Sequence, residues 1–149
     1  MEGKFKNVLS KSDYGGLIMT KLFIGSDHGA LELKDKLVAY LKTITAIDLT
    51  DCGTFDTQSV DYPDIADSVV KQVLNDSNNL GILCCGTGIG ISIKANRNKG
   101  IRAALVYDEF TSKMAKEHNN ANILCLGGRT TSFESAKIYI STWLNSAYE

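Results

Sequence analysis

The sequence predicts an α/β fold in which helices cover both faces of a five-stranded parallel sheet. Three observations support this prediction. Strand-like and helix-like segments alternate five times along the chain. The central apolar runs lack the two-residue alternation of a half-exposed strand, as expected for strands that are buried on both faces. A glycine-rich turn follows the apolar run 80–85, and ligands bind at such carboxyl ends of parallel strands.

The first half of the chain contains two strand–helix units. Residues 22–26 form the first expected strand, and apolar residues then recur at helical spacing over residues 30–41. Residues 46–50 form the second strand and lead into a polar loop. The chain's only proline, Pro63, stands in the first turn of the next helix, where its missing N–H has no helical partner to lose.

The second half repeats this pattern three times. The three expected strands are residues 80–85, 101–107 and 123–126. The helices between and after them begin at the glycine turn, at Asp108 and near Ser132. Aspartate is a favoured N-cap, so we expect Asp108 to start the fourth helix.

We expect a three-layer α/β/α sandwich with the strand order 2-1-3-4-5, the simplest doubly wound arrangement of the Rossmann and flavodoxin type. Its switch point lies between strands 1 and 3, which places Asp27 and His28 beside Cys85. The other strand ends add polar residues to this edge: Cys52, Thr87, Asp108 and Arg129. His118 and Asn119 end the fourth helix, so we expect them at the opposite edge, from which a partner subunit would return them to the site.

Residues 1–20 differ from the rest of the chain because they show little periodicity and end in two glycines and a second methionine, Met19. We interpret residues 1–20 as a poorly ordered N-terminal extension and residues 21–149 as a single domain. The opening residues do not match a secretory signal. We therefore expect a cytoplasmic protein whose four cysteines are reduced.

The composition argues against several kinds of partner. A net charge of −1 provides no basic surface for nucleic acid or for an anionic membrane. No apolar run approaches the roughly 20 residues of a membrane helix. The four cysteines and two histidines lack the paired spacing of a zinc site, so we expect no metal.

The turn at residues 86–90 (GTGIG) joins a buried strand to a helix N-terminus. Unpaired N–H groups at such a terminus attract anions, and the helix dipole favours a thiolate there. Cys85 adjoins the turn, whereas Cys84 points to the opposite face of the strand. Cys85 is therefore the candidate nucleophile or general base. The turn also fits a tight connection without any ligand, and its spacing matches neither a dinucleotide fingerprint nor a P-loop.

Several segments keep one order and spacing from about Lys21 to the C-terminus: Gly25-Ser26-Asp27-His28-Gly29, Asp61-Tyr62-Pro63, Cys85-Gly86-Thr87-Gly88-Ile89-Gly90-Ile91-Ser92-Ile93, Ala95-Asn96, Gly100-Ile101-Arg102-Ala103, His118-Asn119 with Asn122, and Gly127 with Arg129. Together they resemble ribose-5-phosphate isomerase B, a family of sugar-phosphate isomerases. One branch of that family carries a glutamate base where this chain has Ile91, so the chain resembles the branch with a cysteine base.

The resemblance implies an aldose–ketose isomerase of the pentose phosphate pathway. It interconverts ribose 5-phosphate and ribulose 5-phosphate through an enediolate, without a metal or an organic cofactor. Cys85 would move the proton between C2 and C1, and Thr87 with the turn backbone would hold the enediolate oxygen. His118 from the other subunit of a homodimer, or of a dimer of dimers, would assist ring opening. The implied substrate contacts are Asp27, His28, Gly86, Gly88, Ile89 and Gly90, with Asn119 and Arg129 from across the interface.

Two other functions stay open at this point. A hexose-6-phosphate isomerase acting on allose or galactose 6-phosphate fits the same motifs, because pocket depth separates the substrates. A non-catalytic module that binds a phosphate or nucleotide on a flavodoxin-like sheet belongs to a different class. The thiol beside the turn and the two histidines argue against the second alternative.

Overall fold

The computed structural model describes residues 10–11, 17–55 and 62–149. Its main sheet consists of parallel strands β3 (Thr20–Ser26), β4 (Ile47–Asp51), β5 (Leu80–Cys85), β6 (Ala103–Leu105) and β7 (Ile123–Gly127). The helices are α1 (Leu31–Leu41), α2 (Tyr62–Leu74), α3 (Ile89–Asn96), α4 (Glu109–Glu117) and α5 (Phe133–Asn145), and the short 3-10 helix η2 (His28–Ala30) precedes α1. Two short strands, β1 (Ser10–Lys11) and β2 (Leu17–Ile18), pair antiparallel before β3.

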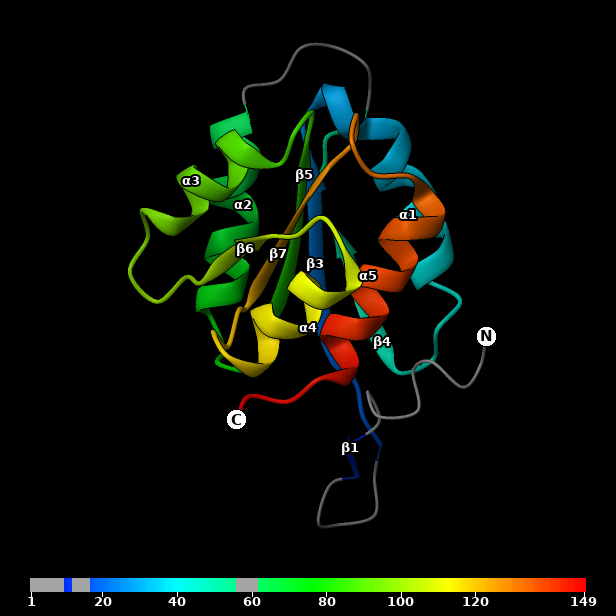
Figure 1. Ribbon diagram of the computed structural model, residues 1–149, viewed down its shortest axis with the longest axis vertical. Helices are drawn as coiled ribbons and strands as arrows, with labels where there is room; N and C mark the ends of the chain where they lie inside the picture. Colours follow the sequence, from blue (N-terminus) through cyan, green and yellow to red (C-terminus); the bar gives the residue numbers. More distant parts are fainter. Residues whose placement is uncertain (1–9, 12–16, 56–61) are drawn as a thin grey trace.

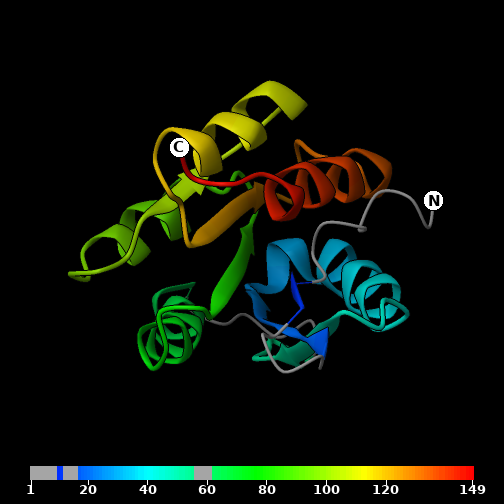
Figure 2. The same cartoon turned by 90° about the horizontal axis from the view of Figure 1, so that it is seen from below.

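The helices cover the sheet on both faces, as Figures 1 and 2 show. Helices α2 and α3 lie on one face, where Val69, Leu83 and Ile123 belong to one buried cluster. Helices α1, α4 and α5 lie on the other face, where Leu37 and Trp143 belong to a second cluster. The predicted three-layer α/β/α sandwich is therefore confirmed. None of the described helices is long and apolar enough to cross a membrane.

Local signals start the helices where the sequence indicated. The Asp108 carboxylate accepts a hydrogen bond from Thr111 N at 2.6 Å and caps α4. The Ser132 hydroxyl accepts one from Ser135 N at 3.1 Å and caps α5. Both caps satisfy N–H groups that the first helical turn leaves without a partner.

The strand order is β4-β3-β5-β7-β6, which is 2-1-3-5-4 in chain order. The prediction of 2-1-3-4-5 is right for the first three strands and wrong for the last two, because β7 inserts between β5 and β6. All five residues of β7 are buried, as a strand covered on both faces requires. Strand β6 occupies the edge of the sheet, and its three residues are all half-buried. It is shorter than the predicted strand 101–107.

The strand register fixes which strand ends meet at the carboxyl edge of the sheet. Ser26 of β3 lies opposite Cys84 of β5, and Cys85 lies opposite Gly127 of β7. Strands β3, β5 and β7 therefore end side by side, and the chain segments that follow them form one loop cluster. The predicted N-terminal extension and the polar loop after β4 fall largely on residues outside the described ones.

Candidate active site

Three loops meet at the carboxyl edge of the sheet. Asp27 N donates to the Cys84 carbonyl at 3.1 Å, which joins the loop after β3 to β5. Gly128 N donates to the Cys85 carbonyl at 2.8 Å, and Arg129 N donates to the Gly86 carbonyl at 2.9 Å. These bonds attach the loops after β3 and β7 to the glycine turn after β5, so the predicted proximity of Asp27 and Cys85 is confirmed.

Cys85 is the last residue of β5, and only 6% of its surface is exposed. Its Sγ accepts a hydrogen bond from the backbone N–H of Gly88 at 3.1 Å. Gly88 precedes α3 and has a left-handed backbone with φ of +78°, which turns this N–H back toward the strand end. The sulfur is therefore held in one orientation, at the N-terminal end of a helix.

The other cysteines are poor candidates for a thiolate. Burial, with smaller contributions from Cys85 and Asp27, raises the pKa of the Cys84 thiol to about 12. Burial also raises the pKa of Cys125 well above its ordinary value. The pKa of Cys52 is raised by burial and by the neighbouring Asp51 carboxylate. Each of these three thiols is neutral at physiological pH, since burial in apolar surroundings disfavours the charged form.

Some donors of the turn have no partner among the described residues. The Thr87 hydroxyl oxygen accepts from Ile89 N at 3.2 Å, and its own proton remains available to donate. The N–H groups of Gly90 and Ile91 lie in the first turn of α3 and have no partner within the helix. The turn thus offers a hydroxyl and backbone N–H groups near Cys85, which suits an oxygen that becomes negatively charged.

Arg129 reaches the turn from within the same subunit. A Cβ placed on Gly86 would lie 3.6 Å from both Cδ and Nε of Arg129, so the arginine side chain lies over this glycine. The sequence placed Arg129 at the same edge of the sheet as Cys85, whereas the family resemblance implied a contact from across a subunit interface. Because β7 lies beside β5, the loop after β7 brings Arg129 to Gly86 within the subunit.

The Asp27–His28 loop lies on the other side of the turn. The Asp27 carboxylate accepts from Gly29 N at 2.9 Å and caps η2, and the His28 side chain is exposed. A Cβ placed on Gly29 would lie 3.7 Å from the backbone nitrogen of Gly86. Asp27, His28 and Arg129 therefore surround the glycine turn within one subunit.

His118 and Asn119 are not part of this cluster. Both are exposed and follow α4 at the edge where β7 begins. That edge lies four strand residues from Gly127, about 13 Å at the usual rise per residue. The predicted separation from Cys85 is confirmed within the subunit. Asp108 follows β6 at the carboxyl edge, but its carboxylate caps α4. Strand β7 lies between β6 and β5, so Asp108 is separated from the glycine turn.

Sequence reasoning missed two contributors to this edge. Gly128 packs so closely on η2 that an added Cβ would lie 2.7 Å from Ala30 Cβ, and only glycine permits that approach. Lys34 is fully buried and bonds to Asp51 and to the Thr54 carbonyl. Lys34 lies three residues before Leu37, on the apolar face of α1, and this spacing could have indicated that its side chain is buried.

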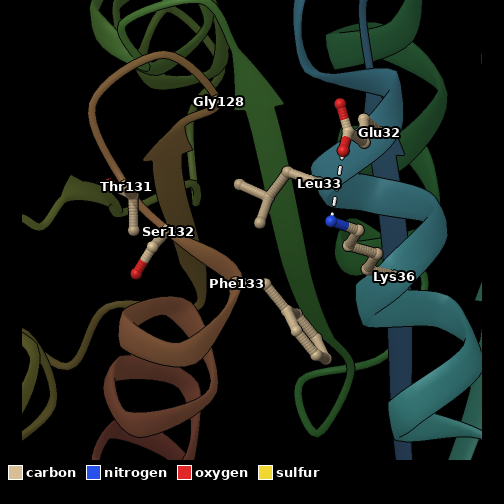
Figure 3. Close-up of a pocket in the computed structure, with 7 residues that line it drawn as sticks. All are labelled: Glu32, Leu33, Lys36, Gly128, Thr131, Ser132 and Phe133. Atoms are coloured by element: carbon tan, nitrogen blue, oxygen red, sulfur yellow. Dashed lines mark ion pairs between the residues drawn. The ribbon is translucent and has the colours of Figure 1, made fainter.

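A pocket of about 290 Å³ adjoins the loop after β7 (Figure 3). Leu33 of α1 and Phe133 of α5 extend into the space between the two helices. Glu32 and Lys36 form an ion pair of 3.1 Å at its rim, so their charges largely offset each other. Within the described parts of the chain, no three His, Cys, Asp or Glu side chains are arranged to hold a metal ion.

Comparisons with known proteins agree on one family. The model of the Ribose/Galactose Isomerase family matches residues 22–149. Ribose-5-phosphate isomerase B of Escherichia coli is 37% identical over 131 residues, which cover 88% of this chain and 87% of that protein. The galactose-6-phosphate isomerase subunit LacB of Clostridium acetobutylicum is 40% identical, covering 85% and 72% of the two chains. The crystal structure of a Thermotoga maritima ribose 5-phosphate isomerase superposes with a TM-score of 0.83 at 46% identity, covering 87% and 88%.

Proposed function

The chain belongs to the ribose/galactose isomerase family, and on that premise we propose that it interconverts ribose 5-phosphate and ribulose 5-phosphate. The observation that carries this proposal is the Cys85 side chain, whose sulfur is held by Gly88 N–H beside a turn with free backbone donors. Moving a proton next to a carbonyl requires a positioned base and a site for the resulting oxyanion. Cys85 and the turn supply these two elements together.

The chemistry follows from the positions of these groups. The Cys85 thiolate removes the C2 proton of the open-chain aldose, and the C–H electron pair becomes the C1–C2 double bond. The negative charge moves to O1, where the Thr87 hydroxyl and the N–H of Gly90 stabilise it. A proton then passes from O2 to O1, and the Cys85 thiol returns its proton to C1 while the C2–O2 bond becomes the carbonyl of the ketose. One such donor contributes on the order of 3 kcal/mol to the stability of a developing oxyanion.

The substrate phosphate lies at the edge of the cluster in this proposal. Arg129 carries a permanent positive charge beside Gly86, and His28 is exposed on the other side of the turn. Asp27 binds a sugar hydroxyl through its second carboxylate oxygen, which has no hydrogen-bond partner among the described residues, since the first oxygen accepts from Gly29 N.

In this proposal the protein is a homodimer, and a second subunit completes each site. His118 and Asn119 of one subunit lie at the glycine turn of the other. Exposed apolar side chains on α3, which begins at the turn, and around the start of α4 support this proposal. Ile89 and Ile93 of α3 are 51% and 55% exposed, and Tyr107 and Phe110 are 70% and 68% exposed. Side chains of this size and exposure are typical of a surface that another protein chain covers.

A galactose-6-phosphate isomerase is the second candidate, because LacB is a relative of similar identity. Turnover of ribose 5-phosphate, allose 6-phosphate and galactose 6-phosphate by one preparation separates the candidates. We further propose that residues 21–149 form the catalytic domain, since the family model spans nearly the same range. The four free thiols favour a reducing compartment such as the cytoplasm.

Replacing the proposed base tests the mechanism. Cys85→Ala should abolish isomerisation of ribose 5-phosphate, a loss of at least about 1000-fold in kcat, while circular dichroism shows a folded protein. Cys84→Ala is the matched control, because this neighbour points into the opposite core and should retain kcat in whatever protein remains folded. Turnover by Cys85→Ala within about tenfold of the wild type would rule out Cys85 as the base.

Mixed subunits test the shared site. Neither Cys85→Ala nor His118→Ala should be active alone. When the two are unfolded together and refolded, heterodimers should regain activity, because one of their two sites combines an intact Cys85 with an intact His118. A mixture that stays as inactive as its components would place the whole site within one subunit.

A further inference from the structure

Lys34 is a buried cation that the proposed chemistry does not use. It lies on α1, none of its surface is exposed, and its ammonium group has three N–H donors. Nζ lies 3.0 Å from Asp51 Oδ1, 2.8 Å from Asp51 Oδ2 and 2.6 Å from the Thr54 carbonyl oxygen. The ring of Phe55 lies over the ammonium at 5.0 Å. The hydrogen bonds of this lysine therefore run to the end of β4 and to the segment that follows it, and the exposed Asp35 carboxylate of α1 also lies 3.3 Å from Nζ.

The same contacts shape that segment. Asp51 Oδ1 also accepts from Gly53 N at 2.9 Å, which bends the chain directly after β4. The Gly53 carbonyl then accepts from Ser26 N at 2.7 Å, and Thr54 N donates to the Ser26 carbonyl at 2.8 Å. Residues 52–54 thus continue alongside β3 as far as the residue before Asp27.

The Asp27–His28 loop is consequently held from two sides. On one side, Asp27 N donates to the Cys84 carbonyl at 3.1 Å. On the other side, the backbone of Ser26 is bonded to the segment that Lys34 anchors. Removal of the lysine would release the second side and leave the Asp51 carboxylate, which is 17% exposed, without its cation.

We propose that Lys34 is a positioning residue of the isomerase site, which holds the Asp27–His28 loop in register with the glycine turn by anchoring residues 51–54. Lys34 does not contact the substrate. A buried ion pair that served stability alone would be replaceable by apolar side chains of similar size, whereas a directional anchor would not be. The inference rests on the proposed function, because it assigns Asp27 and His28 to substrate binding.

The test compares Lys34→Met with the double variant Lys34→Met/Asp51→Leu. The single variant should lose stability, and the double variant should recover most of it, because no charge is left buried without a partner. Both should show KM for ribose 5-phosphate raised roughly tenfold with a smaller change in kcat, since the loop that binds the substrate is displaced. Leu37→Ala, one turn along α1 and equally buried, is the control for destabilisation and should keep the wild-type KM.

Two outcomes would overturn the inference: a wild-type KM in the stabilised double variant, or a KM in Leu37→Ala raised as much as in Lys34→Met. The double variant decides the matter even if Lys34→Met does not fold. Failure of the proposed function has a different signature, which is a wild-type protein inactive on ribose 5-phosphate. The same KM comparison then uses the hexose 6-phosphate that the wild type converts.

Discussion

Gly88 combines a left-handed backbone with close contacts, so its replacement by alanine has a calculable effect. Its φ is +78°, a conformation that costs residues with a Cβ about 1–2 kcal/mol. A Cβ on Gly88 would lie 2.6 Å from Leu105 Cδ1 and 3.0 Å from the carbonyl carbon of Leu126. Overpacking of this kind adds about 1–3 kcal/mol. Gly88→Ala should therefore lower the free energy of unfolding by about 2–5 kcal/mol, measured by urea denaturation.

The same substitution should reduce catalysis. Relief of the overlap with Leu105 and Leu126 moves the turn, and with it the N–H that Gly88 directs at Cys85 Sγ. A shift of about 1 Å in a catalytic geometry lowers turnover by as much as 100-fold, so kcat for ribose 5-phosphate should fall at least tenfold.

Gly100→Ala is the matched control for the backbone conformation. Gly100 also has a positive φ, +91°, but the nearest atom to an added Cβ is Leu74 Cδ2 at 3.1 Å, and Leu74 is 48% exposed and free to move. This variant should lose only about 1–2 kcal/mol and keep its kcat. Equal destabilisation by the two substitutions, or an unchanged kcat in Gly88→Ala, would refute the packing argument.

Two further predictions concern stability. Burial, aided by the charge of Arg102, lowers the pKa of Lys116 from 10.5 to about 8, so between pH 8 and 10.5 the unfolded chain binds more protons than the folded one. Taken alone, this shift makes the free energy of unfolding rise with pH over the window, by on the order of 3 kcal/mol, whereas the buried thiols of Cys84 and Cys125, whose pKa is raised, lower it above about pH 9. The contribution of Lys116 is therefore measured as a difference: in urea titrations from pH 8 to 10.5 the wild type should gain stability relative to Lys116→Met. Ser26 is fully buried, and its hydroxyl has no hydrogen-bond partner among the described residues, so Ser26→Ala should leave stability unchanged or raise it by up to about 1 kcal/mol. A loss above about 1 kcal/mol in that variant would show that the hydroxyl has a partner in solution.

Most of the strands and helices were predictable because their signals are local. The Asp108 cap and the apolar spacing of α2 lie within a few residues of the elements that they specify. The choice of Cys85 over Cys84 was likewise local, since neighbouring side chains in a strand point to opposite faces. The buried environment that raises the pKa of Cys84 agrees with that choice.

The order of the last two strands was not predictable from alternation alone. After β5, the next strand in the chain, β6, can pair directly with β5, or it can lie one position further out so that β7 pairs with β5. Both arrangements are compatible with the same local sequence. Burial decides between them: β7 is apolar enough for the interior, whereas the short β6 tolerates the edge. This choice brings Arg129 to Gly86 within the subunit.

The sequence by itself therefore determined the layers, the glycine turn and its thiol, since each depends on periodicity or on neighbouring residues. Only the tertiary structure decided which loops surround that turn. The bond between Lys34 and Asp51 joins residues 17 positions apart, and whether a lysine there is buried depends on the strand that its helix covers. Interactions between distant segments need the packed sheet, because their energies arise only when the chain has brought the partners together.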